Sequence, residues 1–159
     1  MRDTDKAMPD QPEPPDLDAV FRDFRDEVTR HTELTETEQQ YKLGLTYRDM
    51  GMIDDAVREL ERAARSPRLR FEASALVARL QRDRGNLAAA IEWFERGAEA
   101  PSSTPEAGRD LLFELAQTLE SAGETARALA VYMELQSDAG DYRDVAARIE
   151  RLRRTEAGS

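Results

Sequence analysis

One stretch of the sequence decides the fold. It is Tyr41-Lys42-Leu43-Gly44-Leu45-Thr46-Tyr47-Arg48-Asp49-Met50-Gly51, followed shortly by Asp54-Asp55-Ala56. Its end is repeated as Arg82-Asp83-Arg84-Gly85, so the two turn glycines, Gly51 and Gly85, stand 34 residues apart. A third copy, from Leu115 to Gly123, ends in the same way. A fixed period of about 34 residues, with a helix–turn–helix pattern in each period, predicts a helical solenoid.

Each repeat is expected to hold two helices separated by the turn glycine. In the first repeat, Thr35 and Glu38 have the spacing of a capping box, which predicts a helix from about residue 36 to residue 50. Gly51 then ends this helix, because glycine readily adopts the left-handed conformation that is common at helix C-termini. A second helix is predicted over residues 54–64.

Amphipathic helices are expected at both ends of the repeats. Residues 17–31 carry one apolar face, and Asp16 can cap the first turn. Residues 141–154 carry another, with arginines that are either solvated charges suited to the helix dipole or a binding patch. We interpret both helices as caps that cover the ends of the solenoid. The two apolar stripes are Leu17, Val20, Phe21, Phe24 and Val28, and Tyr142, Val145, Ile149 and Leu152.

The repeats resemble those of the tetratricopeptide repeat family. In the first repeat, the family pattern is met by Leu43-Gly44, by Tyr47 and by Ala56, and the small residues allow two helices to approach closely. The resemblance covers about residues 35–140 and implies an all-α fold. The fold would be a right-handed α-solenoid of three tetratricopeptide helix pairs with N- and C-terminal capping helices, eight helices in all. The arrangement is similar to small bacterial three-repeat modules, which are often attached to proteins of motility or pilus assembly.

The two ends of the chain differ from the repeats in composition. Residues 1–16 are rich in proline and acidic side chains, which predicts a disordered tail or, alternatively, a docking peptide. A second short disordered tail is expected at the other end. The expected organisation is a tail (1–16), a repeat domain (17–154) and a tail (155–159), the domain comprising a cap (17–31), repeats (about 35–68, 69–102 and 105–140) and a closing helix (141–154).

The composition argues against several classes of partner. A net charge of −10 and a pI near 4.7 disfavour nucleic acid and anionic membrane surfaces, because both are bound by clusters of Lys and Arg. The absence of cysteine excludes disulfides and thiolate metal sites. The sequence contains no run of about 18 or more apolar residues, so we expect no transmembrane helix. Residues 1–6 lack the apolar stretch of a secretory signal, so we expect a cytoplasmic location.

No residue pattern indicates catalysis. His31 is the only histidine, no serine stands in a nucleophile elbow, and no glycine-rich phosphate loop is present. Neighbouring carboxylates such as Asp54 and Asp55 are explained by solvated helix faces. We therefore predict a protein that is not an enzyme and that needs no cofactor and no metal.

Two functions remain open. The first is a protein–protein interaction scaffold that holds a peptide segment or a partner protein in the concave groove of the solenoid. The alternative is a structural or assembly element of a larger complex, such as one in motility or pilus assembly, that contacts partners through its convex face or its end caps. By itself the chain is expected to be a monomer.

The resemblance also implies which residues line the groove, because the first helix of each pair faces it in this family. Carried onto this chain, the main positions are Tyr41, Leu45, Arg48, Arg79, Arg82, Phe113 and Gln117, and further ones are Glu38, Asp49, Glu72, Ala75, Asp83, Asp110 and Glu120. Arginine suits bidentate capture of carboxylates, and aromatic residues often anchor interfaces. The expected partner therefore carries acidic and apolar side chains. Alternatively, these arginines only pair with neighbouring Asp and Glu on a solvated surface.

Overall fold

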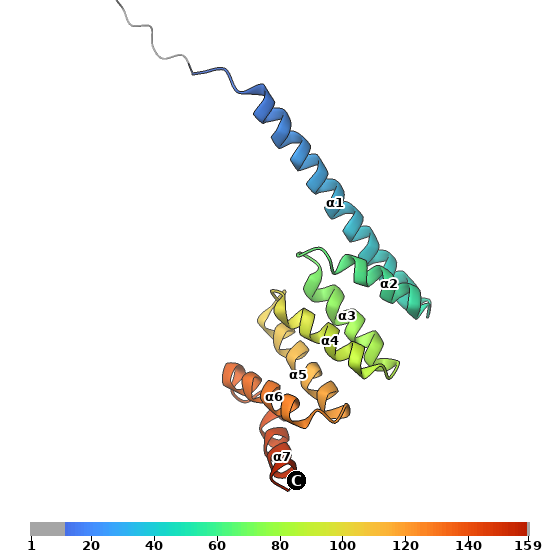
Figure 1. The fold of residues 1–159 in the computed structure, drawn as a ribbon, viewed down its shortest axis with the longest axis vertical. Coiled ribbons are helices and arrows are strands. Elements are labelled where there is room, and N and C mark those ends of the chain that lie inside the picture. Colours follow the sequence, from blue (N-terminus) through green and yellow to red (C-terminus); the bar gives the residue numbers. More distant parts are fainter. Residues whose placement is uncertain (1–11, 159) are drawn as a thin grey trace, which may run out of the picture. The chain divides into compact units, whose positions relative to one another are not determined.

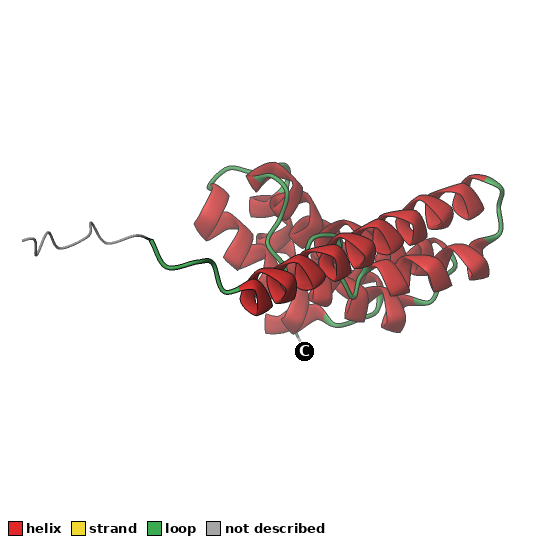
Figure 2. Ribbon diagram, turned by 90° about the horizontal axis from the view of Figure 1, so that it is seen from above, coloured by secondary structure: helices red, strands yellow, loops and turns green. Residues whose placement is uncertain are grey.

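The computed structural model describes residues 12–158, apart from the side chain of Leu34. These residues form seven α-helices. Figure 2 shows helices and loops and no strand among the described residues. Most of the predicted N-terminal tail, residues 1–11, lies outside the described residues. In the order of Figure 1, the helices are α1 (Leu17–Asp49), α2 (Ile53–Ala63), α3 (Arg70–Asp83), α4 (Leu87–Glu99), α5 (Pro105–Ser121), α6 (Thr125–Ala139) and α7 (Val145–Ala157).

Helix α1 joins two helices that the sequence predicts to be separate. It runs without interruption from Leu17 to Asp49, so the expected break before Thr35 and the capping box there are wrong. The described residues therefore contain seven helices rather than eight. The reason lies in the residue types, because neither glycine nor proline occurs between Leu17 and Gly44. The predicted start is confirmed, since the Asp16 carboxylate accepts a hydrogen bond of 3.1 Å from the N–H of the second helical residue.

The chain divides into two units, one that ends at Leu34 and one that begins at Thr35, and α1 contributes to both. In the first unit, the apolar stripe of residues 17–28 is not buried. Its five side chains are between 47% and 66% exposed, which is the opposite of what a packed capping helix requires.

The second unit repeats one backbone turn. Gly51 and Gly85 have φ angles of 77° and 82°, in the left-handed region that glycine tolerates best. After the first of them, the N–H of Met52 donates to the carbonyl of Tyr47 at 2.9 Å, and the same bond recurs one repeat later at Asn86. The predicted turn between the paired helices is thereby confirmed.

Small residues allow the helices of the second unit to approach closely. A Cβ atom at Gly44 would lie 2.7 Å from Cγ of Leu60 in α2 and 3.4 Å from the carbonyl oxygen of Ala56. A Cβ atom at Gly97 in α4 would lie 2.8 Å from Cδ1 of Leu111 in α5. The distances of 2.7 and 2.8 Å are too short for packed carbon atoms. A larger side chain at Gly44 would therefore force the helices apart, and one at Gly97 would require the Leu111 side chain to shift. The predicted contact between Gly44 and the second helix is confirmed.

Helix α7 covers the far end of the repeats, as predicted. Its stripe of Val145, Ile149 and Leu152 is buried in the hydrophobic core that extends from α3 to α7. The helix runs from Val145 to Ala157 instead of the predicted residues 141–154, so Tyr142 of the predicted stripe lies before it. The largest fully buried side chains of the described residues include Tyr132, Phe94, Leu60, Leu111 and Leu119.

Two of the arginines of α7, Arg148 and Arg151, bind the same carboxylate of α5, whereas Arg154 is a solvated charge that pairs with Glu150 of its own helix. The Arg148 guanidinium donates to the Glu120 carboxylate and to the Tyr132 hydroxyl, both at 3.2 Å. Arg151 donates to the other oxygen of Glu120 at 2.7 Å. Helix α7 is therefore fixed to α5 and α6 by charge-assisted hydrogen bonds as well as by apolar contacts.

Candidate partner-binding groove

The first helices of the pairs enclose a small hollow in the second unit. It has a volume of about 240 Å³ and is lined by residues of α1, α3 and α5, together with Ser103 of the loop before α5. We call it the groove hollow. Its lining consists of Tyr41, Phe71, Glu72, Ala75, Leu76, Arg79, Ser103, Ala107 and Asp110.

The spacing of residues in α3 explains this arrangement. Glu72, Ala75 or Leu76, and Arg79 follow one another at intervals of three and four residues, so they share one face of the helix. Ala75 projects little beyond the backbone, which leaves room between the longer side chains around it. Of the main predicted groove positions, Tyr41 and Arg79 line the hollow, and Glu72, Ala75 and Asp110 join them from the wider set.

Two of the predicted arginines share one carboxylate of the next repeat. Nε and Nη2 of Arg79 lie 3.0 and 2.7 Å from Oε2 of Glu114, and Nη1 of Arg82 lies 3.0 Å from Oε1. The Glu114 side chain is only 18% exposed, so these pairs are better shielded from water than surface ion pairs. Arg82 also contacts the exposed Asp83 at 3.3 Å.

Glu114 is the main residue of this region that sequence reasoning missed. It stands 35 residues after Arg79 and 32 after Arg82. The turn glycines of these two repeats, Gly85 and Gly123, are 38 residues apart, so the repeat register does not place Glu114 opposite either arginine. The resemblance to the family assigns groove positions but not pairs of this kind.

The other predicted groove residues lie in different surroundings. Arg48 pairs with its sequence neighbour Asp49 at 3.0 Å on the exposed end of α1. Leu45 and Gln117 are half-buried and do not line the groove hollow. Arg48, Arg79 and Arg82 each pair with an Asp or a Glu of the chain, as the alternative considered from sequence describes.

Phe113 belongs to the hydrophobic core and not to the surface of the groove. Its side chain is 4% exposed, and its ring meets those of Tyr132 and Tyr142 edge to face, with centroids 6.0 and 6.1 Å apart. The guanidinium of Arg143 lies 4.9 Å from the ring centroid, which is within cation–π range. A partner could not reach this ring without opening the core.

Two further polar groups, the Tyr41 phenol and the Asp110 carboxylate, line the groove hollow. Burial raises the pKa of the Tyr41 phenol, and the nearby negative charge of Glu72 adds to this effect. Asp110 accepts hydrogen bonds from the Tyr142 hydroxyl and from Arg143, the latter at 2.8 Å. The Tyr41 hydroxyl therefore remains a neutral hydrogen-bond donor, and Asp110 is held in place.

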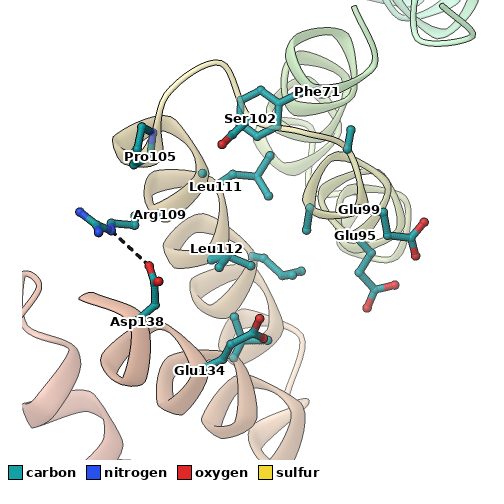
Figure 3. A pocket seen from close by; sticks show the side chains of 15 residues that line it. Phe71, Glu95, Glu99, Ser102, Pro105, Arg109, Leu111, Leu112, Glu134 and Asp138 are labelled. Carbon is teal, nitrogen blue, oxygen red and sulfur yellow. Dashed lines mark hydrogen bonds and ion pairs between the residues drawn. The ribbon is translucent and has the colours of Figure 1, made fainter. Parts of the chain in front are cut away.

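A second and larger hollow lies between α4, α5 and α6 (Figure 3), with a volume of about 620 Å³. We call it the α4–α6 hollow. Leu111 and Leu112 belong to its apolar lining, and Glu95, Glu99, Glu134 and Asp138 carry the acidic groups around it. Arg109 donates to Asp138 at 3.3 Å, which is the dashed contact in Figure 3.

Comparisons with known proteins agree with this architecture. No curated protein matches the sequence significantly. Residues 41–105 match a family model described as tetratricopeptide repeat. In the part of the chain that the structure describes, none of the helices has both the length and the apolar character needed to cross a membrane.

Solved structures with this fold include two of MamA and one of a secretion chaperone. The first MamA structure is 21% identical, with a TM-score of 0.60, over 80% of this chain and 67% of that one. The second is 20% identical, with a TM-score of 0.60, over 89% and 80%. The type III secretion chaperone SycD of Yersinia enterocolitica, in complex with a peptide of the translocator YopD, is 17% identical, with a TM-score of 0.59, over 75% and 93%. The family match over residues 41–105 and the fold shared with these structures together identify tetratricopeptide repeats in this chain.

Proposed function

We propose that this chain is a non-enzymatic interaction scaffold that holds a peptide segment of a partner protein in the groove hollow. The observation that carries the proposal is the hollow itself, because it joins the first helices of three consecutive repeats. Its volume of about 240 Å³ lies below the usual range for cofactor and drug-sized sites and suits one or two side chains of a peptide. The peptide in the SycD structure supports the proposal by analogy of fold.

The lining suggests the chemistry of the bound segment. An apolar side chain would pack on Phe71 and Leu76, and the Tyr41 hydroxyl can donate a hydrogen bond to the peptide backbone. Arg79 and Arg82 share the carboxylate of Glu114, and Arg82 also contacts Asp83, so these four groups together carry no net charge. The charged residues that line the hollow are Glu72, Arg79 and Asp110, so a carboxylate of the partner would be favoured only beside Arg79.

A second candidate function is assembly into a larger complex through the α4–α6 hollow. This hollow is more than twice as large as the groove hollow, and apolar and polar residues both line it. Its four carboxylates outnumber its single arginine, Arg109, so it would favour a basic partner. The two functions therefore differ first of all in the place of binding.

The experiment begins with capture of partners by the full chain and identification by mass spectrometry. Two matched variants then locate the site, since each replaces an exposed glutamate at the edge of one hollow by a bulky ring. Glu72→Trp should fill the groove hollow and weaken binding by about tenfold or more, while Glu134→Trp should leave the affinity unchanged.

The opposite result would move the site to the α4–α6 hollow and favour the assembly function. Loss of binding in neither variant would exclude both sites. Circular dichroism at the same concentrations checks that both variants keep the helicity of the parent chain.

A further inference from the structure

The first unit carries an apolar surface that the groove proposal does not use. We call it the N-terminal stripe, and it consists of Leu17, Val20, Phe21, Phe24 and Val28. The two phenylalanines are 60% and 66% exposed. Contiguous exposed apolar residues, with charged residues on the other faces of the helix, are typical of a protein-interaction surface.

The spacing of the stripe is symmetric. Leu17, Phe21, Phe24 and Val28 follow one another at intervals of four, three and four residues, which read the same from either end. This is the alternation of a short coiled-coil seam over two heptads. When two copies lie antiparallel, Phe21 of each faces Phe24 of the other, and Leu17 of each faces Val28 of the other. The same surface then serves both copies, as a two-fold interface requires.

The charges beside the stripe fit the antiparallel arrangement. Asp18 and Arg25 occupy equivalent positions on one side of the seam, seven residues apart. In an antiparallel pair, Asp18 of each copy lies near Arg25 of the other, so two opposite charges meet on each side of the two-fold axis. In a parallel pair, Arg25 would instead lie beside Val20 of the other copy and gain no ionic partner. The charge pattern therefore selects one orientation.

The exposed area is sufficient for a weak but specific dimer. Five large side chains that are about half exposed or more can remove on the order of 1,000 Å² from water when two copies pair, which is the lower limit of a specific interface. Burial of the stripe by a second copy removes this apolar area from water.

We propose that this chain forms a homodimer through antiparallel pairing of residues 17–31. The occupant of the N-terminal stripe is the same stripe of a second copy. The proposal replaces the monomer expected from sequence. It is independent of the groove hollow, which lies entirely in the second unit.

Light scattering on the full chain, coupled to size exclusion, measures the effect directly. The parent chain should have twice its mass of 18.0 kDa at high micromolar concentration, and the double variant Phe21→Asp with Phe24→Asp should have the single mass. Met50→Asp is the matched control, because Met50 is also 66% exposed but lies outside the stripe, and it should remain dimeric. A parent chain of single mass, or a double variant that stays dimeric, would overturn the proposal.

Cysteine cross-linking tests the orientation, because the native chain contains no cysteine. Leu17→Cys and Val28→Cys should form a disulfide-linked dimer under mild oxidation when the two variants are mixed, and little when each is oxidised alone. Efficient cross-linking of each variant with itself would show parallel pairing and contradict the proposal. Absence of any cross-link in the mixture would contradict it as well.

Discussion

The two terminal helical segments look alike in sequence and differ in structure. Residues 17–31 of α1 and residues 145–157 of α7 are both amphipathic, with apolar side chains on one face and mixed charges on the other. In α7 the stripe is buried, and Arg148 and Arg151 bind Glu120 of α5. In α1 the stripe is exposed, and an ion pair of this segment, between Arg30 and Glu27, stays within the helix.

The difference shows what an amphipathic pattern predicts and what it leaves open. Apolar residues on one face indicate that something covers this face. The pattern does not tell whether the covering surface belongs to the same chain. In α7 the covering surface belongs to the same chain, because Arg148 and Arg151 bind the half-buried carboxylate of Glu120 in α5. The charges beside the stripe of α1 are complementary to a second copy.

The largest difference in the free energy of unfolding should appear when a valine of each stripe is replaced by aspartate. Val145 is fully buried and Val28 is 47% exposed, so the same substitution compares the two helices directly. Val145→Asp should lower the free energy of unfolding by about 3–5 kcal/mol, because it buries a charge without a partner. Val28→Asp should change it by less than about 0.5 kcal/mol in dilute solution, where self-association does not contribute.

Urea denaturation followed by circular dichroism measures both changes. A cost of several kcal/mol for Val28→Asp in dilute solution would show that the first stripe is packed within one chain. In that case the contrast between the two terminal helices would disappear.

An intermediate effect is expected from Tyr132, which connects α6 to Arg148 of α7. Burial and the hydrogen bond with Glu120 raise the pKa of its phenol above the ordinary value near 10. Above about pH 10 the unfolded chain loses this proton while the folded chain keeps it, so the free energy of unfolding falls as the pH rises. The slope for one tyrosine is at most about 1.4 kcal/mol per pH unit.

Tyr132→Phe removes this proton and should make the decrease between about pH 10 and pH 11 shallower. Between about pH 6 and pH 8 the curves of the two proteins should run parallel, with the variant lower by the hydrogen bonds it lacks. Urea denaturation at each pH supplies both curves. Equal slopes above pH 10 would mean that Tyr132 ionises equally readily in the folded chain.

The smallest effects concern single surface arginines of the two segments. Arg151→Ala removes a hydrogen bond of 2.7 Å to Glu120 and should cost about 0.5–1 kcal/mol, a value limited by the exposure of Arg151. Arg30→Ala removes an exposed pair within one helix and should cost less than about 0.5 kcal/mol. Equal costs, measured by urea denaturation, would indicate that the Glu120 network does not hold α7 in place.

Most of the fold could be predicted from sequence, because it depends on local patterns. The turn at Gly51, the closing helix and the small residues at the helix contacts each have a signature within a few residues. The break predicted before Thr35 was wrong because a capping box has the same residue types as an ordinary polar helix interior, and no glycine or proline stops the helix there.

The candidate site could be predicted only in part. Tyr41 and Arg79 follow from the repeat register, and both line the groove hollow. The burial of Phe113 does not follow from it, since it depends on Tyr132 and Tyr142, which come from later elements of the chain. The pairing of Arg79 with Glu114 depends on the distance between two repeats, which the loop before α5 sets and the register alone does not.

The close approach at Gly97 has a consequence for related sequences. A single methyl group there would lie 2.8 Å from Cδ1 of Leu111, and the two residues belong to different repeats. A homologue with alanine at position 97 can keep the spacing of α4 and α5 only if position 111 becomes smaller or takes another shape. Within the family these two positions should vary together, and their covariation would record the contact between the second and third repeats in the history of the protein.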